Sequence, residues 1–353
     1  DTASAGTWRL SPPTAGSQPV PRTHEPRPLA PPLLPRFPFQ RVTRLTCPLP
    51  TSKINGDSVL DFLGTMPPSE SIIILACDKA SYTEQCLRSL LSASPIRFEV
   101  IVVDNGSTDH TPQLLRDMAP AFDAAGASLR VIRNQTNLGA CRGRNQGLAA
   151  AQGRYLVFLD NDCVISDPNW IETLRAAIEA QPRPALAGPK ICYPFEPHDI
   201  QCAGVGISPS GRVQFRGRGE PRSDPRFNQR RQVQALISAC LMFPREIYEA
   251  IGGLDEAYSP VQFEDFDFCY RAKAAGYLVL YVPEAEVYHW ESVTSGGTAA
   301  LPNTYLIIKN GLRLKKTWRH VFEKEHGPPD AECSWRVITA PGLDGQARRL
   351  GAR

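Results

Sequence analysis

The segment that most constrains the fold is residues 156–162, which read LVFLDND. Its apolar part has the pattern of a strand buried on both faces, which is typical of parallel sheets in α/β domains. Asp160 and Asp162 stand at the carboxyl end, and because alternate residues of a strand point to the same side, both carboxylates could face one crevice. Such a pair can share a divalent cation, although the same motif is often only a solvated turn or a helix cap.

The segment before it predicts a βαβ unit. Residues 71–77 and 98–104 read as buried strands, and residues 82–91 between them read as a helix. The second strand ends in the sequence DNGSTD, in which Ser107 can cap the next helix and Asp104 can accept hydrogen bonds from a sugar or a base. The alternative is a plain strand-to-helix turn.

A third strand, residues 128–133, leads into a polar, glycine-punctuated helix start at residues 137–147, NLGACRGRNQG. A helix N-terminus favours negative charge, and Arg144 adds a cation there. This part of the chain therefore predicts an anion-binding crevice next to the acidic strand.

Together these motifs resemble the nucleotide-sugar-binding half of the family-two glycosyltransferases, which are inverting enzymes of the GT-A fold, and within them the rhamnosyltransferase-like subgroup. The resemblance implies a Rossmann-like, mostly parallel central sheet with flanking helices and an acceptor-side half. It also implies that Asp160 and Asp162 bind ribose and a metal ion. The further donor-binding residues that it implies are Ala76, Asp78, Asp104, Asn105, Ser107, Asn137, Gly139, Arg144, Asn145 and Asn161.

A second group of motifs lies downstream. Residues 237–245 read as a strand, residues 246–251 as a short helix, and residues 263–276, FEDFDFCYRAKAAG, as the start of an amphipathic helix. Acids at a helix start are usually dipole partners, but Glu264 and Asp265 match the catalytic Glu-Asp motif of the family. We expect Asp265 to be the general base, with Glu264 as the alternative, because neighbouring side chains on a helix diverge by about 100°.

Residues 277–283 read as a further strand, followed by His289. The resemblance implies that His289 completes the metal site, and an imidazole with carboxylates suits Mn²⁺ better than Mg²⁺. Residues 292–296 are expected to form a loop over the diphosphate. Residues 303–319 read as a basic amphipathic helix whose Lys309 or Asn310 could reach the acceptor or a phosphate.

The expected function is transfer of a sugar from a UDP-sugar, or less favourably a dTDP- or GDP-sugar, to a glycan, lipid-linked or small-molecule acceptor. One alternative is a non-catalytic module that binds a nucleotide-sugar or a glycan, which the presence of both acidic motifs disfavours. A nucleotidyltransferase would need a Gly-rich phosphate loop after the first strand, and a dinucleotide dehydrogenase a GxGxxG motif; the sequence there is CDKASY.

Composition fits one α/β domain with tails. The chain has 353 residues, 42% of them hydrophobic, and a net charge of +3, which is too small to indicate a nucleic-acid partner. We expect a Pro-rich leader over residues 1–66 that could link to a fused or missing partner domain, a donor half over 67–190, an acceptor half over 191–322 with a variable insertion at 194–234, and a peripheral tail over 323–353. Ten cysteines without Cys-x-x-Cys spacing indicate a reduced, cytoplasmic protein, with peripheral membrane association as a further option.

Overall fold

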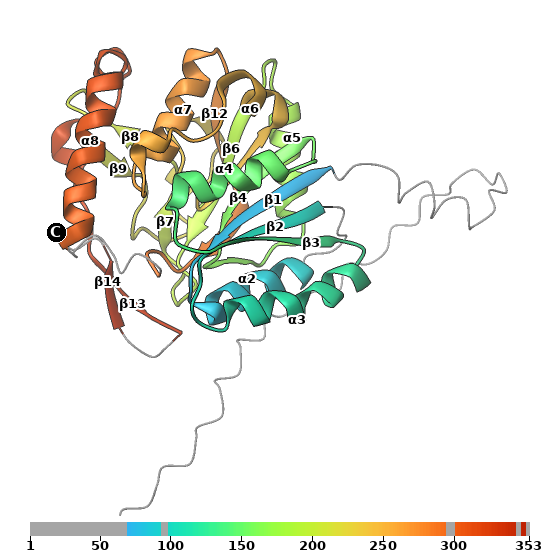
Figure 1. Ribbon diagram of the computed structural model, residues 1–353. Helices are drawn as coiled ribbons and strands as arrows, with labels where there is room; N and C mark the ends of the chain where they lie inside the picture. The colour runs from blue at the N-terminus through green and yellow to red at the C-terminus, as the bar shows by residue number, and fades with distance from the viewer. Residues whose placement is uncertain (1–68, 93–97, 294–300, 344–346, 351–353) are drawn as a thin grey trace, which may run out of the picture. The chain divides into compact units, whose positions relative to one another are not determined.

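The structure is a computed structural model, and it describes residues 69–92, 98–293, 301–343 and 347–350 (Figure 1). The leader expected at residues 1–66 lies outside these ranges, and the described residues belong to one compact unit. The α-helices are α2 (Ala80–Ser92), α3 (Thr111–Ala124), α4 (Ala140–Ala150), α5 (Trp170–Glu179), α6 (Arg245–Ile251), α7 (Glu264–Ala274) and α8 (Leu301–Phe322). Short 3₁₀ helices are η1 (Pro225–Phe227), η2 (Glu256–Tyr258) and η3 (Asp330–Glu332).

A ten-stranded mixed sheet forms the centre, with the order β10-β12-β6-β11-β4-β1-β2-β3 and with β5 and β7 added to β12 and β6. Its strands are β1 (Glu70–Ala76), β2 (Phe98–Asn105), β3 (Ser128–Asn134), β4 (Tyr155–Asp160), β5 (Cys163–Ile165), β6 (Ala185–Cys192), β7 (Ile200–Cys202), β10 (Arg231–Gln232), β11 (Cys240–Pro244) and β12 (Leu278–His289). Two hairpins complete the fold: β8 (Val205–Ile207) with β9 (Val213–Phe215), and β13 (Ile338–Pro341) with β14 (Ala347–Leu350).

The sheet confirms the predicted α/β class. Strands β4, β1, β2 and β3 run parallel, and β11 runs antiparallel between β4 and β6. Helices α2 and α3 cover one side of the sheet, and α4 and α7 lie on the other (Figure 1). The parallel strands are continuous apolar runs because both faces of this part are covered; Ile72, Ile73 and Ile74 of β1 are fully buried.

Two glycines allow α4 to lie close to β1. A Cβ atom added to Gly143 would meet the side chain of Leu75 at 2.3 Å, and one added to Gly147 would meet Ile73 at the same distance. Because no other residue type fits this approach, the helix turn that carries Arg144 is held next to the carboxyl end of the sheet.

Strand β12 is longer than the sequence predicted. We expected a strand over residues 277–283, but β12 extends to His289. Its pairing with β6 is shifted between Val282 and Glu286, and this irregularity interrupts the apolar pattern that marks a strand in the sequence. His289 is thus the last residue of a buried strand rather than part of a following loop.

Part of the expected peripheral tail packs against the domain. Glu325 accepts a hydrogen bond of 2.7 Å from the hydroxyl group of Tyr270 in α7 and forms an ion pair with Lys273. Among the described helices, none combines the length and the apolar character that a bilayer crossing requires.

Candidate functional site

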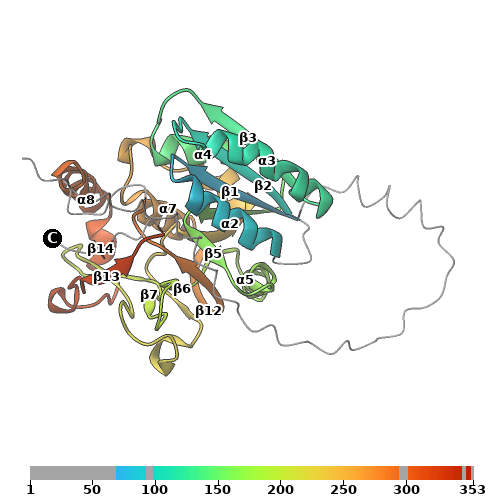
Figure 2. The ribbon, with the colours of Figure 1, turned by 90° about the horizontal axis from the view of Figure 1, so that it is seen from below.

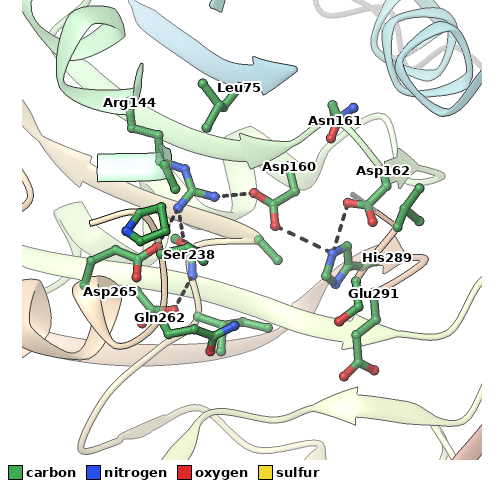
Figure 3. Close-up of a pocket in the computed structure, with 18 of the residues that line it drawn as sticks. Leu75, Arg144, Asp160, Asn161, Asp162, Ser238, Gln262, Asp265, His289 and Glu291 are labelled. Carbon is green, nitrogen blue, oxygen red and sulfur yellow. Dashed lines mark hydrogen bonds and ion pairs between the residues drawn. The ribbon is translucent and has the colours of Figure 1, made fainter. Parts of the chain in front are cut away.

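A cavity of about 460 Å³ opens at the carboxyl ends of β1 and β4 (Figure 3). This size is typical of small-molecule sites. Its polar lining comes from distant parts of the chain: Asn105, Asn137, Arg144, Asp160, Asn161, Asp162, Gln201, Ser238, Gln262, Glu264, Asp265, His289, Glu291 and Ser292. The fold therefore brings both acidic motifs of the sequence and the expected histidine into one site.

Asp160, Asp162 and His289 form a cluster in which one ligand atom from each residue lies within 4.8 Å of the others. His289 Nε2 is 3.1 Å from Asp162 Oδ1 and 3.6 Å from Asp160 Oδ2. The pairing of β12 with β5 sets this geometry, because His289 lies opposite Cys163, the residue after Asp162. Figure 3 shows the imidazole between the two carboxylates.

The charges of this cluster suit a divalent cation. Burial lowers the pKa of His289, but the adjacent carboxylate of Asp162 outweighs burial and, together with Asp160, raises the pKa to about 9. Burial raises the pKa of Asp162, but the imidazolium outweighs it and holds this pKa below its usual range. Two carboxylates and one imidazole form a donor set that fits Mn²⁺ and other divalent transition metals better than Mg²⁺.

Gln201 of β7 fixes the orientation of the imidazole, and the sequence motifs did not indicate it. Its Nε2 donates to the backbone carbonyl of His289 at 3.1 Å, so its Oε1 faces His289 Nδ1 at 2.7 Å and accepts from it. With Nδ1 held in this way, Nε2 lies on the side of the two carboxylates and is the atom that would bind a metal ion after losing its proton. Gln201 is 1% exposed, so this contact is shielded from water.

Arg144 joins the two acidic motifs. Its guanidinium forms an ion pair with Asp160, donates to Ser238 Oγ at 2.8 Å, and lies 3.5 Å from Glu264 Oε1. The side chain is buried, and burial lowers its pKa, but the two carboxylates more than compensate and raise it. We expected Arg144 to attract an anionic ligand, but its charge is already balanced inside the protein, even though it lines the cavity.

Glu264 and Asp265 begin α7, directly after Phe263 in the left-handed region (φ 70°). Glu264 is 3% exposed and faces Arg144. Asp265 accepts hydrogen bonds from the backbone N–H groups of Ser238 (3.2 Å) and Phe266 (2.9 Å). Burial and the neighbouring charge of Glu264 raise the pKa of Asp265 to about 7. A carboxylate with this pKa in a cavity can take up a proton near neutral pH.

Three of the predicted donor-binding residues form one wall of the cavity. Asn105 donates to Asn137 Oδ1 at 2.9 Å and to the carbonyl of Gly139 at 3.2 Å. Its own oxygen accepts from the backbone N–H of Leu138 at 3.0 Å. The predicted turn and the predicted helix start are thus joined by side-chain amides, and all three predicted residues line the cavity.

Asp104 and Ser107 lie behind this wall and do not line the cavity. The carboxylate of Asp104 is fully buried, pairs with Arg133 at 2.9 Å and accepts from the N–H of Ser107 at 2.9 Å. Ser107 Oγ accepts from the N–H of Asp78 at 2.9 Å. In this structure these groups hold the β2–α3 turn, and their predicted contacts with a nucleoside stay predictions.

The other predicted donor-binding residues also have protein partners. Asp78 accepts from the N–H of Thr108 at 2.7 Å, and Ala76 is fully buried at the end of β1. Asn145 binds the backbone of Leu254 through both its amide oxygen and its amide nitrogen. Ala76, Asp78 and Asn145 do not line the cavity, whereas Asn161 does. The amide nitrogen of Asn161 donates to a threonine of α2, Thr83, at 2.9 Å.

The cavity lining also contains two aromatic residues that the sequence did not indicate. Phe215 of β9 and Trp335 of the C-terminal tail both line it, with ring centroids 4.6 Å apart. Glu291, also in the lining, accepts hydrogen bonds from the hydroxyl group of Tyr193 (2.9 Å) and from Arg218 (3.1 Å). Neither Phe215 nor Trp335 belongs to a motif of catalytic residue types, so only the folded chain reveals them.

Of the two residues of α8 that could reach the acceptor or a phosphate, the structure leaves only Lys309 free to do so. Asn310 does not reach the cavity: it is fully buried and donates to the carbonyls of Tyr258 (2.7 Å), Val261 (2.9 Å) and Gln262 (3.2 Å). Lys309 is exposed and does not line the cavity. The helix is oriented so that Asn310 faces the interior of the domain, where it supports the loop before α7. Of the loop expected at residues 292–296, Ser292 and Val293 line the cavity, and the rest lies outside the described residues.

Comparisons with known proteins agree on the family to which this chain is similar. The sequence pattern of Glycosyl transferase family 2 matches residues 71–252. An uncharacterized protein of Sinorhizobium fredii, y4gI, is 29% identical over 263 residues, which are 69% of this chain and 28% of that protein. The N-acetylglucosaminyl-diphospho-decaprenol L-rhamnosyltransferase of Mycobacterium tuberculosis is 28% identical over 251 residues, 64% of this chain and 77% of that enzyme. The chain thus spans less than a third of the length of y4gI.

The crystal structure of GalNAc-T7 with UDP, GalNAc and Mn²⁺ matches the fold with a TM-score of 0.57 and 20% sequence identity. The match covers 73% of this chain and 50% of that one. It confirms the predicted GT-A architecture, with its mostly parallel sheet and flanking helices.

Proposed function

Because this chain belongs to glycosyl transferase family 2, we propose that it transfers a sugar from a nucleoside diphosphate sugar to an acceptor hydroxyl group, with inversion at the anomeric carbon. One observation carries the proposal: a metal-binding set of two carboxylates and an imidazole shares a cavity with Asp265, a carboxylate whose pKa is about 7. A non-catalytic binding module has no need of such a base.

The chemistry follows from the positions of these groups. A divalent ion held by Asp160, Asp162 and His289 would stabilise the negative charge of the departing diphosphate. On the other side, Asp265 accepts the proton of the acceptor hydroxyl as the oxygen bonds to the anomeric carbon and the bond to the diphosphate breaks. A single displacement of this kind inverts the anomeric centre.

Asp265 suits the role of base better than Glu264. The carboxylate of Glu264 faces the Arg144 guanidinium, whereas Asp265 is held by two backbone N–H groups that leave lone pairs of the carboxylate for a ligand. Glu264 then acts indirectly, because its negative charge contributes to the raised pKa of Asp265.

We further propose UDP as the nucleotide of the donor and a rhamnosyltransferase-like specificity. The relative from Mycobacterium tuberculosis supports the second point by its name, which specifies a rhamnosyl group and a lipid-diphosphate acceptor. Phe215 and Trp335 add two neighbouring aromatic rings to the cavity lining, and the apolar C–H face of a sugar ring could pack against them. The cytoplasmic location expected from the cysteine content belongs to the same proposal.

The proposed function is tested by calorimetric titration of the full chain with UDP, GDP and dTDP, each with Mn²⁺ and with EDTA. We expect UDP to bind in the presence of Mn²⁺ and to bind at least about tenfold more weakly in EDTA, because the diphosphate then lacks the cation that would neutralise its charge beside Asp160 and Asp162. Binding of none of the three nucleotides would overturn the assignment of the cavity, and preferential binding of GDP or dTDP would overturn the choice of UDP.

The role of Gln201 gives a second prediction. We expect Gln201→Leu to weaken Mn²⁺ binding by about 10–100-fold, because the substitution removes the group that sets the tautomer and direction of His289. Electron paramagnetic resonance of free Mn²⁺ measures this affinity without reference to activity.

The matched variant is Gln201→Glu, which keeps an acceptor for His289 Nδ1 and should retain most of the affinity. If Gln201→Leu and Gln201→Glu bind Mn²⁺ equally well, Gln201 does not act through the imidazole. Thermal unfolding of both variants shows whether either change affects the fold instead.

A further inference from the structure

Helix α8 exposes an apolar stripe. Tyr305, Ile308 and Leu312 are 67%, 57% and 62% exposed, and they account for three of the six strongly exposed large hydrophobic residues in the described part of the chain. Their spacing of three and four residues places them on one face of the helix. Single exposed apolar residues need no explanation, but three along the same face of one helix indicate a contact surface.

The same helix is strongly basic. Its 22 residues include Lys309, Arg313, Lys315, Lys316 and Arg319, and no Asp or Glu. Arg313 pairs with Asp255, and Arg319 with Glu323. Within the described ranges, Lys309 and Lys316 are exposed and form no ion pair with a carboxylate. The stripe and these two lysines together, named here the α8 face, combine apolar side chains with free positive charge.

The opposite side of α8 is firmly attached to the domain. The buried amide of Asn310 donates to three backbone carbonyls, Trp318 Nε1 donates to Asp267 Oδ1 at 2.9 Å, and Leu314 is 1% exposed. The helix therefore cannot turn its apolar stripe inward without losing these contacts. In both views α8 lies at the edge of the described domain, on the side away from β3 (Figures 1 and 2).

We propose that the α8 face binds the surface of a lipid bilayer that contains anionic lipids. A helix that lies in a membrane interface presents apolar residues to the acyl region and Lys or Arg to the headgroups, which matches this arrangement. Charge complementarity selects the bilayer over a second copy of the chain, because two α8 faces would bring like charges together. Adhesion of this kind requires no spanning helix.

This inference rests on the proposed function in one respect, because it identifies the acceptor as lipid-linked. Leu306 of α8 lines the cavity, and Asn310 holds the loop that leads directly into Glu264 and Asp265. A bilayer at the α8 face would place the headgroup region beside the acceptor side of the site. An acceptor anchored in that bilayer could reach Asp265 without leaving the membrane.

The test is sedimentation of the full chain with vesicles of phosphatidylcholine alone and with vesicles that also contain the anionic lipid phosphatidylglycerol. We expect binding to the anionic vesicles that weakens as salt rises. Lys309→Gln with Lys316→Gln should reduce this binding by about tenfold, and Tyr305→Ser with Ile308→Ser and Leu312→Ser by at least as much. The matched control, Arg88→Gln with Arg116→Gln, removes the same charge from α2 and α3 and should bind like the wild type.

Wild-type binding that both α8 variants retain would overturn the proposal, as would the absence of binding to anionic vesicles. Self-association of the wild type that the apolar triple variant abolishes would assign the face to a second copy instead. Titration of the wild type and of each variant with UDP and Mn²⁺ separates the two proposals. A wild type that binds the nucleotide but no anionic vesicles contradicts only the membrane surface, whereas α8 variants that lose vesicle binding and keep the nucleotide affinity support it. A wild type that binds no nucleotide contradicts the proposed function.

Discussion

Substitution of Asp265 by Asn is expected to lower kcat for sugar transfer by about 10²–10⁴-fold, the usual contribution of a general base. The amide has nearly the same shape and can still accept a hydrogen bond from the N–H of Ser238 or Phe266, so the start of α7 should keep its geometry. It cannot accept the proton of the acceptor hydroxyl. Initial rates of UDP release at saturating donor and acceptor measure the effect.

The pH profile gives a readout that a structural role of Asp265 would not change. The pKa of this carboxyl is raised from 3.8 to about 7, so the base is ionised above that pH and protonated below it. Wild-type kcat should therefore be constant above pH 7 and fall by about tenfold for each pH unit below it. The residual activity of Asp265→Asn should not show this decrease below pH 7.

Controls distinguish Asp265 from its neighbour. UDP affinity of Asp265→Asn should equal that of the wild type, and Asp123→Asn, at an exposed position of α3, should have full activity. If Asp265→Asn keeps wild-type turnover while Glu264→Gln loses both turnover and the step in the pH profile, the base is Glu264 and the assignment made from its ion pair with Arg144 is wrong.

The fold was largely predictable from the sequence because its central strands are buried on both faces. Continuous apolar runs such as residues 71–77 and 98–104 can be stable only inside a covered parallel sheet, and both strands appear within one or two residues of the predicted bounds. Strand β12 was predicted too short because its pairing with β6 shifts within the strand, and a shift of this kind breaks the periodicity on which strand prediction depends.

The site was predictable where its residues are close in sequence. Asp160, Asp162, Glu264 and Asp265 stand in short motifs whose chemistry is evident from residue type, and the structure brings them together. Gln201 and Trp335 were missed for a physical reason: each contacts a residue far away in the chain. A glutamine in a three-residue strand or a tryptophan in an irregular segment carries no periodic pattern. Asn310 shows the converse case: helical periodicity does not say which of two adjacent polar residues, Lys309 or Asn310, faces the interior, and the structure buries Asn310.

Arg144 shows why residue type alone does not fix a role. A cation at a helix N-terminus predicts an anionic ligand, yet this guanidinium is buried between two carboxylates of the protein. Removing one partner of a buried ion pair is more costly than the pair is stabilising. In the structure Arg144 links Asp160 to Glu264, and its predicted contact with the donor stays a prediction.

The second large effect is expected for Asp162→Ala, which should abolish detectable Mn²⁺ binding and lower transfer by about 10²-fold or more. A divalent ion contributes several kcal/mol of stabilisation to the charge on a leaving group, and every 1.36 kcal/mol corresponds to about a factor of ten in rate. Of the two carboxylates in the cluster, Asp162 is the one at hydrogen-bond distance from His289 Nε2, 3.1 Å against 3.6 Å for Asp160. Its loss therefore removes one ligand and the neighbour that positions another. Mn²⁺ affinity by paramagnetic resonance and UDP affinity by calorimetry measure the effect.

The contrast with Asp265→Asn is the sharper part of this prediction, because the two carboxylates lie in one cavity and a general loss of structure would affect both variants alike. Asp162→Ala should weaken UDP binding to the level of the wild type in EDTA, whereas Asp265→Asn should leave UDP binding unchanged. Asp117→Ala, an exposed position of α3, is the matched control. Equal donor binding in Asp162→Ala and the wild type would show that the diphosphate is held without this carboxylate, and the charge of the leaving group would then have to be stabilised by other residues of the cavity.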